Sequence, residues 1–202
     1  VRLGQTRFSA VVTFQGSEFC GTAGFAQTQF AAEAAFNRVR FRGNADFAKT
    51  TWQGNSTFAR STFGKDLFLT ETRVEAPLSF RQARFSQLVN LRGATVLKQV
   101  DFGDGVFAPA SYVNIAALEF NADQAEILGS PNQIGRVLSV PNLAGNETLL
   151  RNLVHNFRQL EQVPDANRIE YTTEQLRLGQ WQQRLTGVNL NTAPRSRLQA
   201  LG

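Results

Sequence analysis

The chain has 202 residues, of which 42% are hydrophobic, and a formal net charge of +5 at pH 7. No apolar run approaches the roughly 20 residues of a membrane-spanning helix, and a single Cys excludes an intrachain disulfide framework. Val1 opens the sequence and Met is absent. We therefore expect the chain to be part of a longer protein or the product of leader cleavage.

Large apolar residues recur over the first 118 residues at alternating steps of five and six. These steps fit neither one face of a helix nor one face of a straight strand. A chain that turns a corner every five or six residues, with one large side chain inward from each side, explains them and predicts a β-solenoid. The 22 positions are Leu3, Phe8, Phe14, Phe19, Phe25, Phe30, Phe36, Phe41, Phe47, Trp52, Phe58, Phe63, Leu69, Val74, Phe80, Phe85, Leu91, Val96, Phe102, Phe107, Val113 and Leu118.

The residue two places before each of these positions is never charged and is usually small or β-branched, as in Val39, Ala45 and Thr50. Such residues fit an inward position beside a bulky aromatic ring. The pattern predicts that Phe58 is fully buried. It also predicts that Val39 points inward between an outward Arg38 and Arg40.

A central Phe or Leu, preceded two residues earlier by Ala, Ser, Thr or Val, resembles the pentapeptide-repeat family in its Phe-centred variety. Phe30–Phe36 and Phe41–Phe47 show the pattern. The resemblance covers about 118 of the 202 residues. It implies a mainly β fold, a right-handed quadrilateral β-helix followed by C-terminal α-helices. Four sides require about 22 residues per coil and about five and a half coils, with residues 22 apart stacked roughly 4.8 Å from each other.

Basic residues concentrate in the repeat region. Residues 1–100 hold 13 Lys and Arg against 6 Asp and Glu, a net charge of +7, whereas residues 101–202 hold 8 against 10. In the predicted coil, residues 22 apart stack, so Phe19, Phe41, Phe63, Phe85 and Phe107 form one column, the Phe19 column. The two sides of the coil that flank this column carry seven basic residues but only two acids, Glu18 and Asp104. We call these seven the basic stripe: Arg38, Arg40, Arg42, Arg60, Lys65, Arg81 and Arg84.

The basic stripe has two interpretations. It is either an ordinary solvated surface or a docking surface for an acidic protein, an anionic lipid or a nucleic acid. Nucleic acid is the weakest of these three, because no aromatic residues are interleaved on the outer surface, as single-strand binding requires.

The loss of the five and six spacing of apolar residues divides the chain into predicted segments. Residues 1–120 form the predicted solenoid, and residues 121–145, punctuated by Gly and Pro, form a connecting segment that covers its last coil. Residues 146–186 form a helical hairpin, with Asn146 as N-cap of its first helix and Pro164 opening its second. This hairpin serves as a structural cap or for homodimerisation. It resembles the segment that follows Phe-rich repeats in some cyanobacterial pentapeptide-repeat proteins.

Residues 187–202 form a predicted terminal helix with Thr192 as N-cap. The segment is similar to the first half of a helix-hairpin-helix motif, in which a glycine-rich hairpin binds phosphate. The second half of that motif is missing, so phosphate binding is not implied.

The sequence offers little support for catalysis, and we expect no cofactor or metal. His155 is the only His, and we interpret it as a boundary residue of a helix. Cys20 follows Phe19 and points outward, and one Cys with one His gives no metal-ligand spacing. Glu71 and Glu75 lie on outer faces, without an apolar pocket that would raise a pKa.

Two function classes remain. The first is a non-catalytic scaffold that docks a protein or anionic partner on a solenoid face. The second is a nucleic-acid-associated or DNA-mimic regulator, a role that some pentapeptide-repeat proteins play against topoisomerases. The resemblance associates that role with an acidic rod, so the basic repeat region disfavours it.

Overall fold

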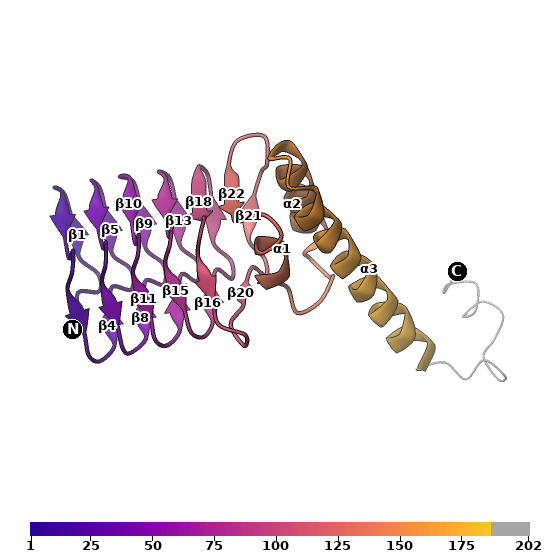
Figure 1. Ribbon diagram of the computed structural model, residues 1–202, viewed down its shortest axis with the longest axis horizontal. Helices are drawn as coiled ribbons and strands as arrows, with labels where there is room; N and C mark the ends of the chain where they lie inside the picture. The colour runs from indigo at the N-terminus through magenta and orange to yellow at the C-terminus, as the bar shows by residue number, and fades with distance from the viewer. Residues whose placement is uncertain (187–202) are drawn as a thin grey trace.

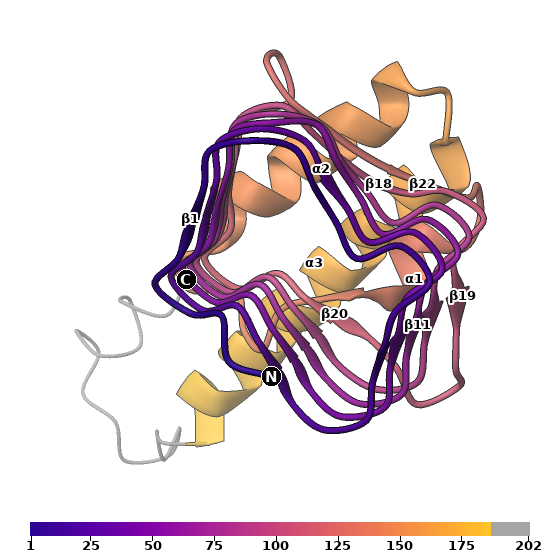
Figure 2. The ribbon, with the colours of Figure 1, turned by 90° about the vertical axis from the view of Figure 1, so that its left-hand side faces the viewer.

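The computed structural model describes residues 1–186 and shows a β-solenoid followed by C-terminal helices (Figure 1). The solenoid makes about six turns of about 22 residues. Viewed along its axis, the coils are four-sided rings built from short strands, and the third side has one strand fewer than each of the others (Figure 2). The predicted architecture is confirmed, whereas the right-handed sense of the coil stays a prediction of the resemblance.

All strand pairs are parallel, and each side of the coil is one sheet. The first side consists of β1 (Arg7–Phe8), β5 (Gln29–Phe30), β9 (Thr51–Trp52), β13 (Arg73–Val74), β17 (Thr95–Val96) and β21 (Glu119–Phe120). The second side consists of β2 (Val12–Thr13), β6 (Ala34–Ala35), β10 (Ser56–Thr57), β14 (Leu78–Ser79), β18 (Gln99–Phe102) and β22 (Glu126–Gly129).

The third and fourth sides complete each ring. The third side consists of β3 (Glu18–Phe19), β7 (Arg40–Phe41), β11 (Thr62–Phe63), β15 (Arg84–Phe85) and β19 (Val106–Phe107). The fourth side consists of β4 (Ala23–Gly24), β8 (Ala45–Asp46), β12 (Leu67–Phe68), β16 (Val89–Asn90), β20 (Val113–Asn114) and β23 (Leu138–Ser139).

Stacked aromatic rings fill the coil interior. Phe36, Phe58 and Phe80 form one column with ring centroids 4.6 and 4.9 Å apart and nearly parallel planes. Neighbouring columns meet edge to face, as Phe47 does with Phe58 at 5.2 Å and 82°. Offset stacks and edge-to-face contacts are the favoured aromatic geometries. Phe58 is fully buried, as predicted.

Small polar residues beside the rings find hydrogen-bond partners inside the coil. Thr72 donates its hydroxyl to the carbonyl of Thr50 at 2.7 Å and accepts the indole N–H of Trp52 at 3.1 Å. Val39 is fully buried, whereas its neighbours Arg38 and Arg40 are exposed. The predicted inward and outward assignment is therefore confirmed at this position.

The stacking register departs from the prediction after Phe107. Val113 pairs with Val89, and Phe120 pairs with Val96, so each of these coil repeats spans 24 residues instead of 22. The two extra residues lie between β19 and β20, around Pro109. The prediction that Val113 and Leu118 continue the 22-residue columns was wrong. Both are still buried, because a shift of two residues keeps every side chain on its own face of a strand.

Residues 121–145 contribute further strands to the solenoid. In this segment β22 pairs with β18, and β23 pairs with β20. The short helix α1 (Ile134–Val137) lies between them. The loss of the five and six spacing of apolar residues therefore marks a change of coil shape, whereas strand pairing between coils continues. The domain boundaries at residues 120, 145 and 186 stay a prediction.

Two helices follow, α2 (Glu147–Gln159) and α3 (Val163–Thr186), at the end of the solenoid opposite the N-terminus (Figure 1). Leu149, Leu153 and Phe157 of α2 are buried in the core that also contains the solenoid. The C-terminal helices predicted from the sequence are thus present. The prediction for residues 187–202, including Thr192 as an N-cap, lies outside the described residues.

Side-chain amides of α2 bind the backbone of the last coils. Asn156 is buried, accepts the N–H of Ile127 at 3.2 Å and donates to the carbonyl of the same residue at 2.8 Å. Asn152 donates to the carbonyl of Phe120 at 2.7 Å. These side chains replace the neighbouring strand that the outermost coil lacks.

Asn146 occupies the N-cap position of α2, but its side chain makes no capping hydrogen bond. It instead accepts the N–H of Ala117 at 2.8 Å and donates to the carbonyl of Asn142 at 3.0 Å. Asn146 therefore stands at the predicted N-cap position, but its side chain does not cap the helix. Its side chain ties the start of the helix to a solenoid corner.

Candidate functional site

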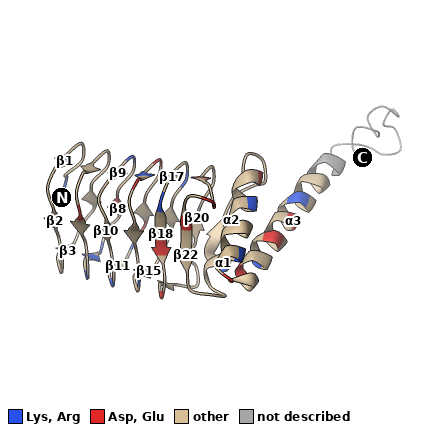
Figure 3. Cartoon of the chain, turned by 90° about the horizontal axis from the view of Figure 1, so that it is seen from above, with Lys and Arg blue, Asp and Glu red and all other residues tan. Residues whose placement is uncertain are grey.

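The basic stripe follows the third side of the solenoid and the two corners that flank it. Arg40 and Arg84 lie in strands of this side. Arg38, Arg60 and Arg81 lie in the corner that precedes it, and Arg42 and Lys65 lie in the corner that follows it. All seven residues are exposed. Figure 3 shows the basic residues distributed along the coils, with residues of both signs on α3.

Arg38 and Arg60 stack on adjacent coils, as the 22-residue period predicts. The backbone N–H of Arg38 donates to the carbonyl of Ala59 at 2.9 Å, and the backbone N–H of Arg60 donates to the carbonyl of Arg81 at 2.9 Å. Both residues have positive φ angles, of 56° and 60°. This left-handed backbone is unfavourable for an L-residue, and here it recurs at the same corner in Gly16 and Gln82. At Arg38, Arg60 and Gln82 the corner therefore repeats the same backbone conformation, with one side chain per coil.

The third side carries a second column of outward residues. Thr62 pairs with Arg40 on one side and with Arg84 on the other, so the two arginines lie two coils apart on one line. Val106 continues the line and is exposed, and Glu18 begins it. The predicted alignment of Arg40 and Arg84 is confirmed.

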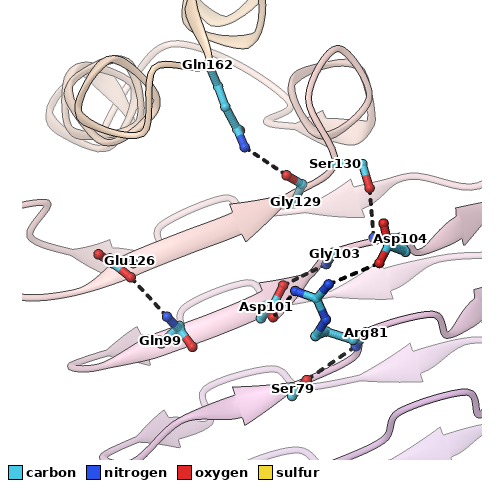
Figure 4. A network of polar contacts seen from close by, with 10 residues as sticks. All are labelled: Ser79, Arg81, Gln99, Asp101, Gly103, Asp104, Glu126, Gly129, Ser130 and Gln162. Atoms are coloured by element: carbon cyan, nitrogen blue, oxygen red, sulfur yellow. Dashed lines mark hydrogen bonds and ion pairs between the residues drawn. The ribbon is translucent and has the colours of Figure 1, made fainter.

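Two members of the basic stripe are ion-paired. Arg42 contacts Glu18. Arg81 contacts Asp101 at 3.3 Å and Asp104 at 3.0 Å, as Figure 4 shows. These pairs reduce the positive charge at the two ends of the basic stripe.

Sequence reasoning missed Asp101 as a partner of Arg81. The carboxylate is buried and also accepts the backbone N–H of Gly103 at 2.7 Å. Asp101 stands in the column that pairs it with Ser79, two residues before Arg81. In the sequence, Asp101 is an acid in a column of small outward residues, and Arg81 stands near it one coil earlier. This combination could have identified the ion pair.

The remaining basic residues form the free part of the basic stripe. Within residues 1–186, the ion pairs include none with Arg38, Arg40, Arg60, Lys65 or Arg84. Arg60 donates to the side-chain oxygen of Gln82 at 2.7 Å, a neutral partner that leaves its charge uncompensated.

A shallow depression of about 510 Å³ lies along the corner of the basic stripe. Arg38, Arg60 and Arg81 line it together with Ala59 and the amides of Asn37 and Gln82. Guanidinium groups and amide N–H groups around a concave surface provide charge-assisted hydrogen bonds to a carboxylate or phosphate. The lining therefore offers hydrogen-bond donors of the kind that an anion accepts.

The residues considered for catalysis are dispersed. Cys20 is exposed at a corner. His155 is exposed on α2, where its Nε2 lies 3.2 Å from Asp123. Glu71 pairs with Lys49 at 3.4 Å. Among residues 1–186, no group of three His, Cys, Asp or Glu side chains is placed to hold a metal, and no helix is long and apolar enough to span a membrane.

The carboxyl of Glu75 has its pKa lowered from the ordinary value. The main cause is the hydrogen bond from Arg73 at 2.6 Å, followed by the hydrogen bond from Gln53 at 3.2 Å. A lowered pKa keeps this group ionised, which is the opposite of what a general acid needs.

Comparison with known families agrees with this geometry. A family model described as pentapeptide repeats, in nine copies, matches residues 25–73 and 58–106. Residues 25–106 of the solenoid are pentapeptide repeats. The matched residues include the whole basic stripe. The similarity of the helical hairpin to cyanobacterial members stays a prediction.

No curated protein and no solved structure matches the chain.

Proposed function

We propose that this pentapeptide-repeat protein is a non-catalytic docking module that binds an acidic protein segment through the basic stripe. The observation that carries the proposal is the pair of columns on and beside the third side. Arg38 and Arg60 stack on adjacent coils at one corner, and Arg40 and Arg84 align on the neighbouring strands. Like charges held this close repel each other, so an anionic partner is the natural complement.

The surroundings favour a protein partner over a nucleic acid. Among the side chains beside the free arginines, Thr62 and Gln82 are neutral and Glu18, next to Arg40, is acidic. The aromatic residues exposed elsewhere in the described part of the chain are Tyr112, Tyr171 and Trp181. Single-stranded nucleic acids bind where bases stack on aromatic rings between basic residues. A DNA-mimic role is disfavoured further, because such a surface would need to be acidic.

A solenoid suits docking, because its rigid sides present an extended surface whose residues repeat at fixed spacing. The interior of this coil is filled by aromatic rings, which leaves the outer faces to contact a partner. Absence of catalysis is part of the proposal.

The test compares two variants with the same change in net charge. In the first, Arg38→Glu and Arg60→Glu reverse the stacked pair of the basic stripe. In the second, Arg92→Glu and Lys98→Glu reverse two exposed residues away from it. Binding of a fluorescent poly-glutamate peptide is measured by anisotropy at several salt concentrations, with single-stranded DNA and anionic vesicles as alternative probes.

We expect the Arg38 and Arg60 variant to lose at least about tenfold in peptide affinity, and the wild-type affinity to fall steeply with salt. The melting temperature should not fall, because the reversed pair stays exposed. Equal losses in both variants would show that the basic stripe is only a solvated surface. Tighter binding of DNA or vesicles than of the peptide would contradict the choice of a protein partner.

A further inference from the structure

Helix α3 presents an exposed face within the described part of the chain. Its buried face carries Ala166 and Ile169, which pack into the core. Tyr171, Leu178 and Trp181 are 56%, 54% and 38% exposed. Their spacing of seven and three residues places them on one line of the helix, opposite the buried face. We call this line the α3 stripe, and it is separate from the basic stripe.

The second half of α3 has little support from the rest of the molecule. α3 has 24 residues and α2 has 13, so α3 is longer by roughly 16 Å at 1.5 Å per residue. Figure 1 shows this half leaving the body of the protein. An unsupported helical segment of this length is marginal in water, whereas packing of one face against a partner stabilises it.

A depression adjoins the α3 stripe at Tyr171. It has a volume of about 620 Å³ and is lined by Arg136, Asn167, Arg168 and Tyr171 among others. The guanidinium of Arg168 lies 5.6 Å from the centre of the Tyr171 ring. Trp is the ring that interacts most strongly with a cation placed over its face. The depression therefore fits an incoming indole ring.

We propose that two copies of the chain associate through the α3 stripe, with their α3 helices antiparallel about a two-fold axis near residue 176. This axis places Trp181 of each copy opposite Tyr171 and the depression of the other. It also places Glu174 of each copy beside Arg177 of the other. Within one chain Glu174 and Arg177 already form an ion pair, so both charges lie on the same part of the helix.

Self-complementarity is the reason to choose a second copy as the partner. A two-fold interface requires that a patch contain both a group and its receptor, at equal distances from the axis. Trp181 and Tyr171 stand five residues on either side of residue 176, and the charges of Glu174 and Arg177 are opposite. Near the axis the α3 stripe carries one acid and one base, Glu174 and Arg177, which together select neither an acidic nor a basic partner.

One pair of helices buries less surface than a standard protein interface. We therefore expect a weak dimer whose population depends on concentration. Trp and Tyr near the centre of such a small interface contribute most of its binding energy.

The first experiment measures the dimer by sedimentation equilibrium of the full chain, with Trp181→Ala and with Tyr112→Ala as a matched control. Tyr112 is another exposed aromatic residue, located in the solenoid. We expect a wild-type dimer, an affinity at least about tenfold lower for Trp181→Ala, and no change for Tyr112→Ala. A wild-type chain that stays monomeric up to about 100 μM, or equal losses in the two variants, overturns the proposal.

The second experiment tests the antiparallel register with Glu174→Arg and Arg177→Glu. Each variant alone places like charges opposite each other and should dimerise less than the wild type. An equimolar mixture should recover the dimer, because the arginine introduced at position 174 then faces the glutamate introduced at position 177 of the other variant. The internal ion pair is broken in both variants, so it cannot cause the recovery. A mixture as weak as the single variants contradicts the register.

Discussion

The two ends of the solenoid are covered to different degrees. In the first coil Leu3, Phe8 and Phe14 are only partly buried, and Val1 is 64% exposed. In the last coil Ile127 is 2% exposed, because α2 lies against it and Asn156 binds its backbone. The comparison shows that apolar side chains and small uncharged ones fill the middle of a coil stack. Covering the edge of a stack also requires groups that bind free strand N–H and carbonyl groups.

The largest difference should appear between the middle of the solenoid and its first coil. Phe58→Ala removes a fully buried ring between two stacked neighbours and should lower the free energy of unfolding by roughly 3–5 kcal/mol. Phe14→Ala removes a partly exposed ring from the same column and should cost about 1–2 kcal/mol. Urea melts measure both. Losses of the same size would mean that the first coil is as well packed as the middle.

The next effect concerns the covered end. Asn156→Leu keeps a side chain of similar size but leaves the N–H and carbonyl of Ile127 without partners, which should cost roughly 2–4 kcal/mol. The matched control is Asn167→Leu, which changes an exposed amide of α3. If both variants unfold at the same urea concentration, the buried amide does not stabilise the strand edge.

The smallest effect concerns a polar chain that reaches the first coil. Arg7 donates to Gln29 at 2.7 Å, Gln29 donates to Gln53 at 2.7 Å, and Gln53 donates to the carboxylate of Glu75. Because the pKa of Glu75 is lowered in the folded state, its contribution is present above the ordinary value of 4.5 and is lost as the pH falls through the folded pKa.

This loss should be confined to the first coils. Hydrogen exchange measured at decreasing pH, and corrected for intrinsic rates, should show lower protection at Phe30 but not at Ile127. Glu75→Gln should remove most of this dependence on pH. A uniform loss along the solenoid would show that the polar chain does not stabilise the first coils selectively.

The sequence predicted the middle of the solenoid well, because each inward position there needs an apolar residue or a small uncharged one. The register after Phe107 could not be predicted in the same way. An insertion of two residues leaves the inward and outward alternation unchanged, so Val113 and Leu118 matched the expected pattern in the wrong columns.

The contacts of the last coil and of the basic stripe were predictable only in part. The columns of Arg38 with Arg60 and of Arg40 with Arg84 follow from the period alone. The pairing of Arg81 with Asp101 depends on side-chain conformations that a period does not specify. Asn152 and Asn156 offered a readable signal, because Asn is a poor helix former and here stands among the buried leucines of α2.

Up to Phe107 the register is regular, so the length of the solenoid increases by a fixed amount with each coil. Strands that pair 22 residues apart add roughly 4.8 Å of length per coil. Deleting one complete coil, such as residues 48–69, would bring the first coils nearer to α3 by that one step and leave every inward column in phase. A lineage of such proteins can therefore change the spacing between two binding surfaces in discrete units, through duplication or loss of short gene segments.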